Sequence, residues 1–185
     1  VWTARAIFPE LADDYRRLSK ALGKSEAPLN VIVSGSGDID LRLPVFASGK
    51  VQALIVTTTA GAKRLFKQDV PDSVEVRAIR SSAGTIPASA ILEEVSRLSP
   101  GKLILVEGGP RLLGDFYAQR LIDEQFLTLA PQIAGRDTDD RRFSLVMGQA
   151  FAPGEVPWGT LSDVRRGSSH LFLRYSFPES RTSRI

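Results

Sequence analysis

The stretch VEGGPRLL, residues 106–113, directly follows the apolar run KLILV at residues 102–106. A short apolar run of this kind is typical of a strand buried in a sheet. The two glycines break the run, and Pro110 suits the first turn of a helix. Residues 102–117 therefore predict a strand, a glycine turn and a helix in direct succession, which is the repeating unit of an α/β protein.

Strands and helices also alternate from this turn back toward the N-terminus. Leucines at helical spacing predict a first helix, which Pro9 begins and Gly23 ends. Apolar strand patterns and helical periodicity then alternate as far as the break at residues 100–101. The predicted elements are a helix at residues 9–22, strands at 29–33 and 51–56, a helix at 60–67, an edge strand at 74–77 and a helix at 87–98.

The C-terminal part carries an antiparallel pattern. After the helix that begins at Pro110, we expect a long strand at residues 125–133, a loop-rich stretch at 136–158 and a closing hairpin at 161–166 and 170–177. The predicted fold class is α/β, with three α/β/α layers and a mixed, mostly parallel sheet that ends in an antiparallel hairpin. Ligands of such sheets collect beyond the carboxyl ends of strands.

The composition excludes several classes of protein. Hydrophobic residues make up 43% of the 185 residues and charged residues 24%, as in a soluble globular domain. No apolar run is long enough to cross a membrane, and the N-terminus lacks the layout of a signal peptide. The chain contains no cysteine, which excludes disulfides and thiolate sites. We therefore expect a cytoplasmic protein that does not bind membranes. The net charge of +3 comes from scattered basic residues, so we do not expect it to bind nucleic acid.

Two strand ends are candidate anion sites. At Gly108 and Gly109 the backbone can approach a bulky anion, and the following helix offers free N–H groups and places Arg111 in its first turn. The alternative is a tight turn that needs glycine for its geometry alone. At Thr57 and Thr58, hydroxyls precede the basic pair at residues 63–64, which could hold the additional phosphate of NADPH. The alternative there is a threonine helix cap followed by solvated basic residues.

Four motifs in order along the chain carry a resemblance to a known family. They are VIVS at residues 31–34, VEGGP at 106–110, LIDE at 121–124 and APQIAG at 130–135. This pattern resembles the reductase domain of the bifunctional riboflavin-biosynthesis deaminase–reductases, which belongs to the dihydrofolate-reductase-like superfamily. The resemblance spans about residues 29–177.

The resemblance implies site residues and an activity. The cofactor would be NADPH, contacted by Ser34, by the turn and helix start at Gly109, Pro110, Arg111, Leu112 and Leu113, by Gly108 beside them, and by Thr57 and Thr58. Glu107 matches the acid that contacts the substrate. The implied reaction is hydride transfer to a small heterocyclic substrate. In the riboflavin pathway this substrate is 5-amino-6-(5-phosphoribosylamino)uracil. A pteridine reductase and a non-catalytic NADP-binding module are the alternatives. The family is typically dimeric, which predicts a homodimer through the C-terminal strands with Phe172 and Tyr175 as contacts.

Two departures from the family limit what the resemblance implies. The deaminase half uses histidine and cysteine zinc ligands, and this chain has one histidine and no cysteine, so deamination is not expected here. The family's reductase opens with a strand–helix–strand portion that precedes the residues given. We therefore expect residues 1–185 to be a single reductase-like domain without that portion, and no catalytic residue is assigned.

Other polar residues that could suggest a site are interpreted as structural. His170 lies in a strand-like run with no acid or second histidine placed near it by a motif. Residues 139–142 and the pair Asp13 and Asp14 are expected to be solvated.

Overall fold

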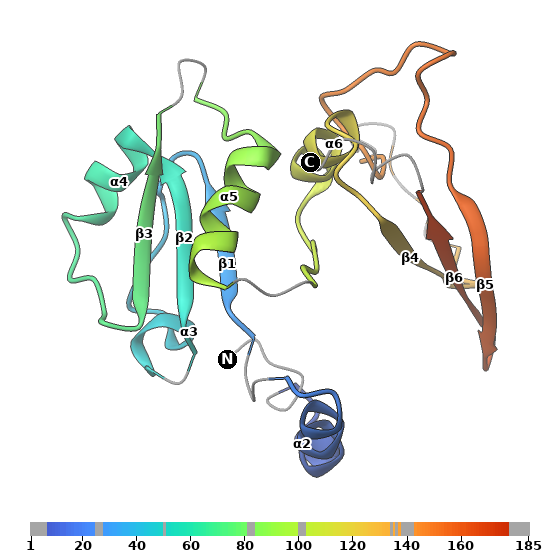
Figure 1. Cartoon of the computed structure of the whole chain (residues 1–185), viewed down its shortest axis with the longest axis horizontal. Coiled ribbons are helices and arrows are strands. Elements are labelled where there is room, and N and C mark those ends of the chain that lie inside the picture. Colours follow the sequence, from blue (N-terminus) through green and yellow to red (C-terminus); the bar gives the residue numbers. More distant parts are fainter. Residues whose placement is uncertain are drawn as a thin grey trace. The chain divides into compact units, whose positions relative to one another are not determined.

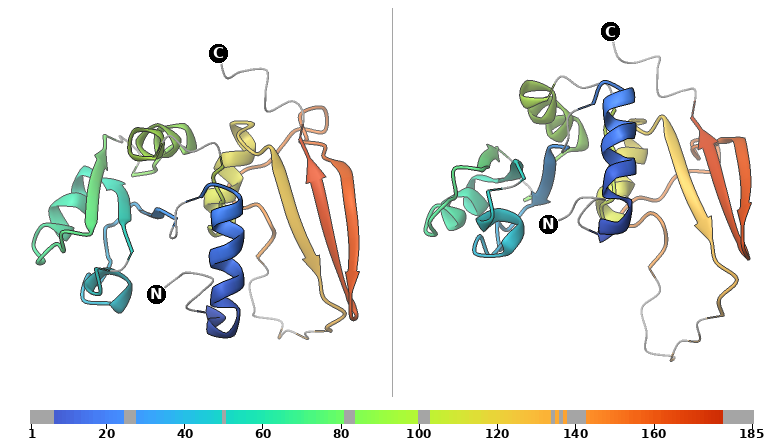
Figure 2. Two further views of the ribbon diagram at one scale, coloured as in Figure 1. Left: turned by 60° about the horizontal axis from the view of Figure 1, so that its bottom comes forward. Right: turned by 90° about the horizontal axis from the view of Figure 1, so that it is seen from below.

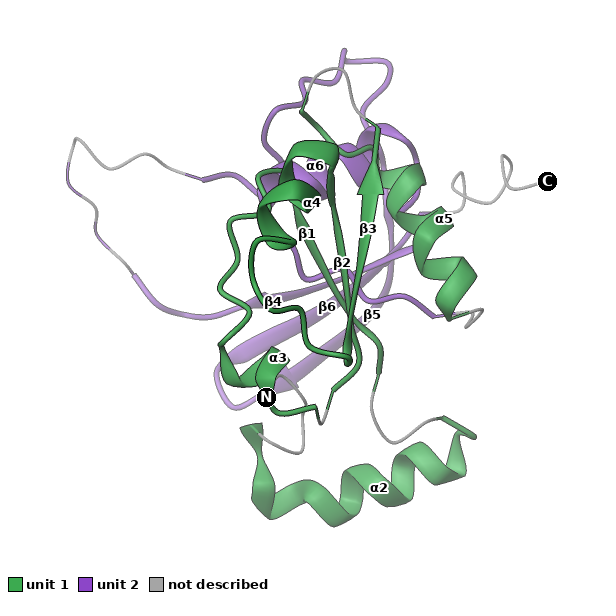
Figure 3. Ribbon diagram, turned by 90° about the vertical axis from the view of Figure 1, so that its left-hand side faces the viewer, with its two compact units in different colours: residues 1–102 green, residues 103–185 purple. Residues whose placement is uncertain are grey.

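The computed structural model describes residues 7–24, 28–49, 51–80, 84–99, 103–133, 135, 137 and 143–177. The chain divides into two compact units, residues 1–102 and residues 103–185 (Figure 3). The predicted α/β class is confirmed: parallel strands with helices form the first unit, and a helix with antiparallel strands forms the second.

The first unit contains three strands and most of the helices of the chain (Figure 1). Its elements are η1 (Pro9–Leu11), α2 (Ala12–Ala21), β1 (Asn30–Ser34), α3 (Pro44–Ala47), β2 (Ala53–Thr58), α4 (Thr59–Leu65), β3 (Val74–Ile79) and α5 (Ala88–Leu98). Seven of these elements lie where the sequence predicts them. The short helix α3 was not predicted, because four residues are too few to show a helical period.

The core of the first unit surrounds its central strand. The strands pair in parallel in the order β1-β2-β3, so β3 is an edge strand, as predicted. All six residues of β2 are buried, which shows that both faces of this strand are covered. On one face, Ala53 and Ile55 pack with Phe46 of α3 and Leu65 of α4. Alternation places Leu54 on the other face, and α5 contacts β2 through its buried residues.

The helix α2 lies on the surface. None of its residues is buried, and Leu18 remains exposed. Asp13 pairs with Arg16 and Asp14 with Arg17 along the same helix, both pairs in solvent. The prediction that the two aspartates are solvated is therefore confirmed. Among the described residues, no helix has the length and apolar character that a membrane crossing requires.

The second unit contains α6 (Pro110–Ala118) and the antiparallel strands β4 (Glu124–Leu129), β5 (Thr160–Gly167) and β6 (His170–Ser176), which lie side by side in the order β4-β6-β5 (Figure 2). The predicted closing hairpin is confirmed as β5 and β6, joined by a two-residue turn in which Ser168 has φ 54°. The parallel and antiparallel strands, expected in one mixed sheet, pair in two separate three-stranded sheets within the described residues.

Tyr117 links α6 to the antiparallel sheet. Its phenol donates a hydrogen bond of 2.6 Å to the side-chain oxygen of Gln125 in β4, and its ring packs edge-on against Phe177. Burial raises the pKa of this phenol. At the start of β6, the His170 ring stacks on the Phe172 ring.

One predicted strand is wrong. Residues 103–106 form no strand, and Leu103 and Leu105 are 81% and 73% exposed; Lys102 lies outside the described residues. The run is apolar at every position, a pattern that suits a strand buried on both faces. Such a strand requires neighbours on its edges, and no other described strand pairs with these residues. The last four residues of the strand predicted at 125–133, residues 130–133, are likewise not in a strand, since β6 pairs no further than Leu129.

Candidate functional site

The first candidate region is the carboxyl end of β1 and β2. Ser34 and Thr57 are partners in the parallel register, so the last residues of both strands lie side by side. Parallel strands place their carboxyl ends at one edge of the sheet, where ligands of α/β proteins bind. The structure therefore brings together three of the predicted site residues: Ser34, Thr57 and Thr58.

The two threonine hydroxyls are engaged within the protein. Thr57 donates to the carbonyl oxygen of Ser34 at 2.6 Å, and Thr58 donates to the carbonyl oxygen of Gly35 at 2.7 Å. The Thr58 hydroxyl also accepts the N–H of Gly61 at 3.1 Å, which caps α4. Both side chains thus bind the loop after β1, and the helix cap considered as an alternative for the threonines is present.

Two glycines let this loop approach α4 at backbone contact. Gly37 has φ +62°, and a Cβ added to it would lie 2.3 Å from the carbonyl oxygen of Gly61. A Cβ on Gly61 would lie 2.0 Å from the Thr57 hydroxyl and 2.9 Å from the nitrogen of Gly37. Neither position has room for a side chain, and these distances describe a closed contact. Sequence reasoning missed this pair, although the SGSG and TAG motifs contain both glycines.

The Ser34 hydroxyl is a polar group available at this end of the sheet. The Ser34 carbonyl accepts from Thr57 and from the N–H of Gly37, whereas no hydrogen bond joins its hydroxyl to another described residue. The side chain is half-buried. A half-buried hydroxyl in a fixed loop can donate to or accept from a small polar ligand.

The second candidate region is the turn before α6. Glu107, Gly108, Gly109 and Arg111 are exposed. Gly109 caps α6 with φ −70° and ψ 170°, and a Cβ added to it would meet no atom within 4 Å. A Cβ on Gly108 would instead lie 2.4 Å from the end of the Leu112 side chain. Open space therefore surrounds Gly109, and its backbone is one that any residue can adopt.

The start of α6 has the donors that a phosphate requires. The first intrahelical bond runs from the N–H of Leu113 to the carbonyl of Gly109. The preceding N–H groups, those of Arg111 and Leu112, belong to the unpaired first turn of the helix. Arg111 forms no ion pair with another described residue. Free N–H groups, a positive helix end and an unpaired cation fit the phosphates of a dinucleotide.

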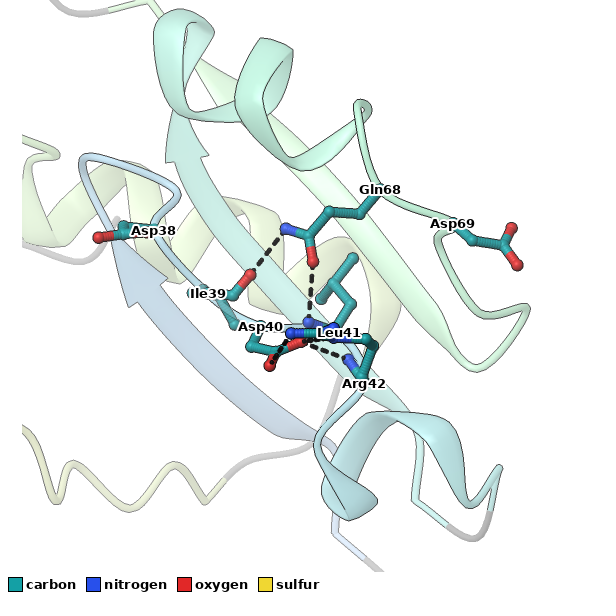
Figure 4. A pocket seen from close by; sticks show the side chains of 7 residues that line it. All are labelled: Asp38, Ile39, Asp40, Leu41, Arg42, Gln68 and Asp69. Atoms are coloured by element: carbon teal, nitrogen blue, oxygen red, sulfur yellow. Dashed lines mark hydrogen bonds and ion pairs between the residues drawn. The ribbon is translucent and has the colours of Figure 1, made fainter.

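A pocket in the first unit lies outside the predicted site residues (Figure 4). It has a volume of about 510 Å³ and is lined by residues 38–42 and 68–69. The Gln68 amide ties its wall together, donating to the carbonyl of Ile39 and accepting the N–H of Leu41. Three aspartates and one arginine line it, and the Arg42 guanidinium bonded to Asp40 lowers the pKa of that carboxyl to about 2. This acidic lining does not suit a phosphate.

Comparison with known proteins identifies the family. The profile of the RibD C-terminal domain matches residues 3–151. The chain belongs to this family. The match includes all of the predicted site residues, from Ser34 to Leu113. A search among curated proteins found no match.

Two solved structures of RibD proteins have a similar fold. One is the diaminohydroxyphosphoribosylaminopyrimidine deaminase/5-amino-6-(5-phosphoribosylamino)uracil reductase of Thermotoga maritima, with a TM-score of 0.58 and 18% identity over 80% of this chain and 37% of that chain. The other is RibD of Acinetobacter baumannii, with a TM-score of 0.50 and 15% identity over 88% of this chain and 50% of that chain. The chain thus spans half or less of these proteins, and the likeness shows a shared dihydrofolate-reductase-like fold.

The predicted site residues of this RibD C-terminal domain fall into two groups, one in each unit. Ser34, Thr57 and Thr58 meet at the end of the parallel sheet. Glu107, Gly108, Gly109, Pro110, Arg111, Leu112 and Leu113 form the turn and first helical residues of the second unit. Residues 139–142 lie outside the described residues.

Proposed function

We propose that this RibD C-terminal domain is an NADPH-dependent reductase of the riboflavin pathway. The observation that carries the proposal is the family match over residues 3–151. The proposed substrate is 5-amino-6-(5-phosphoribosylamino)uracil, after which the reductase activity of the Thermotoga maritima protein is named. The proposed reaction reduces its ribosylamino side chain to a ribitylamino chain.

NADPH, when bound, supplies the hydride, and the residues of the chain bind and orient the reactants. In the proposal, the free N–H groups at the start of α6 and the Arg111 guanidinium bind phosphate oxygens. Gly109 lets a ligand approach the backbone, because no side chain occupies the space beside it. In the first unit, the Ser34 hydroxyl is a separate proposed contact for NADPH.

Glu107 is proposed to bind the substrate. Its carboxylate is exposed and directly precedes the glycine turn. A carboxylate accepts hydrogen bonds from ring N–H groups and ribose hydroxyls, which the proposed substrate carries. In the proposal, its role is to orient the acceptor.

The preference for NADPH over NADH is proposed to depend on Lys63 and Arg64. Both side chains are exposed in the last turn of α4, one turn after the threonine pair. Two cations on a surface of this kind favour a ligand with an additional phosphate.

The proposal includes a homodimer formed through the C-terminal strands. β6 is the central strand of its sheet, so both of its edges are already paired and contact through β6 requires a sheet face. Phe172 and Tyr175 point to opposite faces because they are three residues apart, and Phe172 is the more exposed of the two. The sheet face that carries Phe172 is therefore the proposed interface. Light scattering at micromolar concentration tests this, and a monomer would contradict the homodimer. A cytoplasmic location, in keeping with the absence of cysteine, is also part of the proposal.

The function is tested with the full chain of 185 residues. Calorimetric titration with NADPH and NADH measures binding, and the loss of NADPH absorbance in the presence of the phosphoribosylaminouracil or a dihydropteridine measures turnover. We expect NADPH to bind at least about tenfold more tightly than NADH, which corresponds to about 1.4 kcal/mol. Of the two substrates, we expect only the phosphoribosylaminouracil to be reduced. Reduction of the pteridine would change the substrate, NADPH binding without any turnover would favour a binding module, and absence of dinucleotide binding would overturn the proposal.

A further inference from the structure

The hydroxyls of Thr57 and Thr58 join three elements at one end of the parallel sheet. Both belong to the end of β2: Thr57 donates to the carbonyl of Ser34 at the end of β1, and Thr58 donates to the carbonyl of Gly35 in the loop that follows. Thr58 also accepts the N–H of Gly61 in the first turn of α4. Both donor contacts bridge residues 23 positions apart in the chain. The pair therefore fixes the path of the loop that carries Ser34 relative to the strand beside it.

Neither threonine presents its hydroxyl to solvent. Thr57 is 0% exposed and Thr58 is 7% exposed. Each hydroxyl has one proton, and that proton is donated to a loop carbonyl at 2.6 or 2.7 Å. A ligand phosphate would have to displace a carbonyl to receive either proton. Direct contact between these hydroxyls and a cofactor is therefore disfavoured.

The packing around the pair leaves little freedom for the loop. The Gly37 and Gly61 backbones are in contact. A Cβ added to Gly35 would lie 3.0 Å from the carbonyl oxygen of Gly84. The N–H of Gly37 closes a turn onto the Ser34 carbonyl at 3.3 Å, and that carbonyl is the one that Thr57 holds. The Thr57 hydrogen bond thus adds to the strand pairing of Ser34 and helps to hold its carbonyl in place.

We propose that Thr57 and Thr58 are positioning residues, which hold the loop at residues 34–37 so that the Ser34 hydroxyl is free to contact the cofactor. The proposal rests on the assignment of Ser34 to NADPH under the proposed function. In this proposal, the threonine hydroxyls hydrogen-bond to the protein's own backbone and do not contact a phosphate of the cofactor.

The first measurement needs no cofactor. Thr57→Val keeps the shape of the side chain and removes its donor, while Thr57→Ser keeps the donor. Amide hydrogen exchange at Gly37 reports the order of the loop, because this N–H donates to the Ser34 carbonyl. We expect exchange at Gly37 to accelerate about tenfold in Thr57→Val, the size expected for one lost buried hydrogen bond, and to stay near the parent rate in Thr57→Ser.

Ser73→Ala is the matched control. The Ser73 hydroxyl is buried and donates to the carbonyl of Phe46 at 3.2 Å, beside the opposite end of the same sheet. Its removal deletes the same kind of hydrogen bond from the same unit. We expect a similar loss of thermal stability in Ser73→Ala and Thr57→Val, with faster exchange at Gly37 only in the latter.

The second measurement tests the link to the cofactor. NADPH affinity is compared among Thr57→Val, Ser34→Ala and the double variant. If Thr57 acts through Ser34, each single change weakens binding about tenfold and the double variant weakens it no further. Thr57→Ser should restore the parent affinity, which a general loss of packing would not predict.

The outcomes separate this inference from the proposed function. Unchanged exchange at Gly37 in Thr57→Val overturns the positioning role, whatever the affinities are. Faster exchange with unchanged NADPH affinity, or additive losses in the double variant, shows that the loop does not serve the cofactor through Ser34 and also overturns it. A parent protein that binds no dinucleotide overturns the proposed function and the cofactor role together, while exchange at Gly37 still decides whether the threonine holds the loop.

Discussion

The two candidate regions use glycine in opposite ways. In the first unit, Gly37 and Gly61 are in backbone contact, and neither can accept a Cβ without moving backbone atoms or a buried hydroxyl. In the second unit, Gly109 has an ordinary extended backbone and open space where its Cβ would be. The comparison teaches that a glycine after a strand can serve the protein's own packing or leave room for another molecule. The atoms around an added Cβ distinguish the two.

The largest expected effect comes from filling the open space. Gly109→Val should weaken NADPH binding more than about 100-fold, or about 2.7 kcal/mol, because a branched side chain would occupy the approach to the α6 start. Its free energy of unfolding should fall by no more than about 1 kcal/mol, since the backbone is unstrained and the cost is that of a poorer N-cap residue. Calorimetric titration and denaturant unfolding measure the two quantities. Gly154→Val, at another glycine with open space around it, serves as the control, and a Gly109→Val protein that binds NADPH like the parent would remove the phosphate site from this turn.

The next largest effect comes from adding a methyl group at the backbone contact between Gly37 and Gly61. Gly61→Ala should lower the free energy of unfolding by about 1–3 kcal/mol, the usual range for an overfilled core. Alanine favours a helix over glycine by about 1 kcal/mol, so helix propensity alone predicts the opposite sign. Urea unfolding of Gly61→Ala and of Gly109→Ala compares the two regions with one substitution. Equal stability of the two variants would mean that the contact between Gly37 and Gly61 is not closed in solution.

A smaller effect separates substrate from cofactor within the open turn. Glu107→Gln keeps the size of the side chain and removes its charge, so NADPH affinity should be nearly unchanged. Substrate binding or turnover should fall about tenfold, as expected when a charged hydrogen-bond acceptor is lost. Steady-state kinetics with both reactants varied measures this difference. A loss of NADPH affinity equal to the loss in turnover would instead assign Glu107 to the cofactor.

The smallest effect concerns the segment that follows the closed loop. Asp40 accepts two hydrogen bonds of 2.9 Å from the Arg42 guanidinium, which lower its pKa from 3.8 to about 2. A lowered folded-state pKa stabilises the fold above the unfolded value, and this contribution is lost as the pH falls from about 4 to about 2. In Arg42→Ala, the carboxyl should titrate nearer its ordinary value by NMR, with little change in stability at neutral pH because the pair is exposed. A carboxyl that titrates alike in both proteins would show that the pair does not form in solution.

The sequence predicts the elements of this protein better than its contacts. Periodicity places η1, α2, α4, α5 and α6, and apolar runs place β1, β2 and β3, because these patterns depend on near neighbours. The apolar run at residues 103–106 shows where that reasoning ends. Its composition suits a buried strand, but a strand also needs a hydrogen-bonding partner, which no local pattern specifies.

The candidate site shows the same boundary. Sequence motifs and family resemblance find Ser34, the threonines and residues 107–113. The helix cap was one of the alternatives read from the sequence. The carbonyl acceptors of the two threonine hydroxyls could not be predicted, because they lie 23 positions away. The contact between Gly37 and Gly61 also depends on tertiary structure, so it could not be predicted although the SGSG and TAG motifs contain both glycines.

The two-residue turn between β5 and β6 has a consequence for the order of folding. Gly167 and His170 are paired across it, so the hairpin can close with almost no loop entropy to overcome. Hairpins of this kind form in roughly 1–10 μs. Ser34 and Thr57, by contrast, are partners 23 positions apart, and parallel pairing over such a separation is intrinsically slower. We therefore expect the β5–β6 hairpin to gain protection from hydrogen exchange before the β1–β2 ladder when the chain refolds.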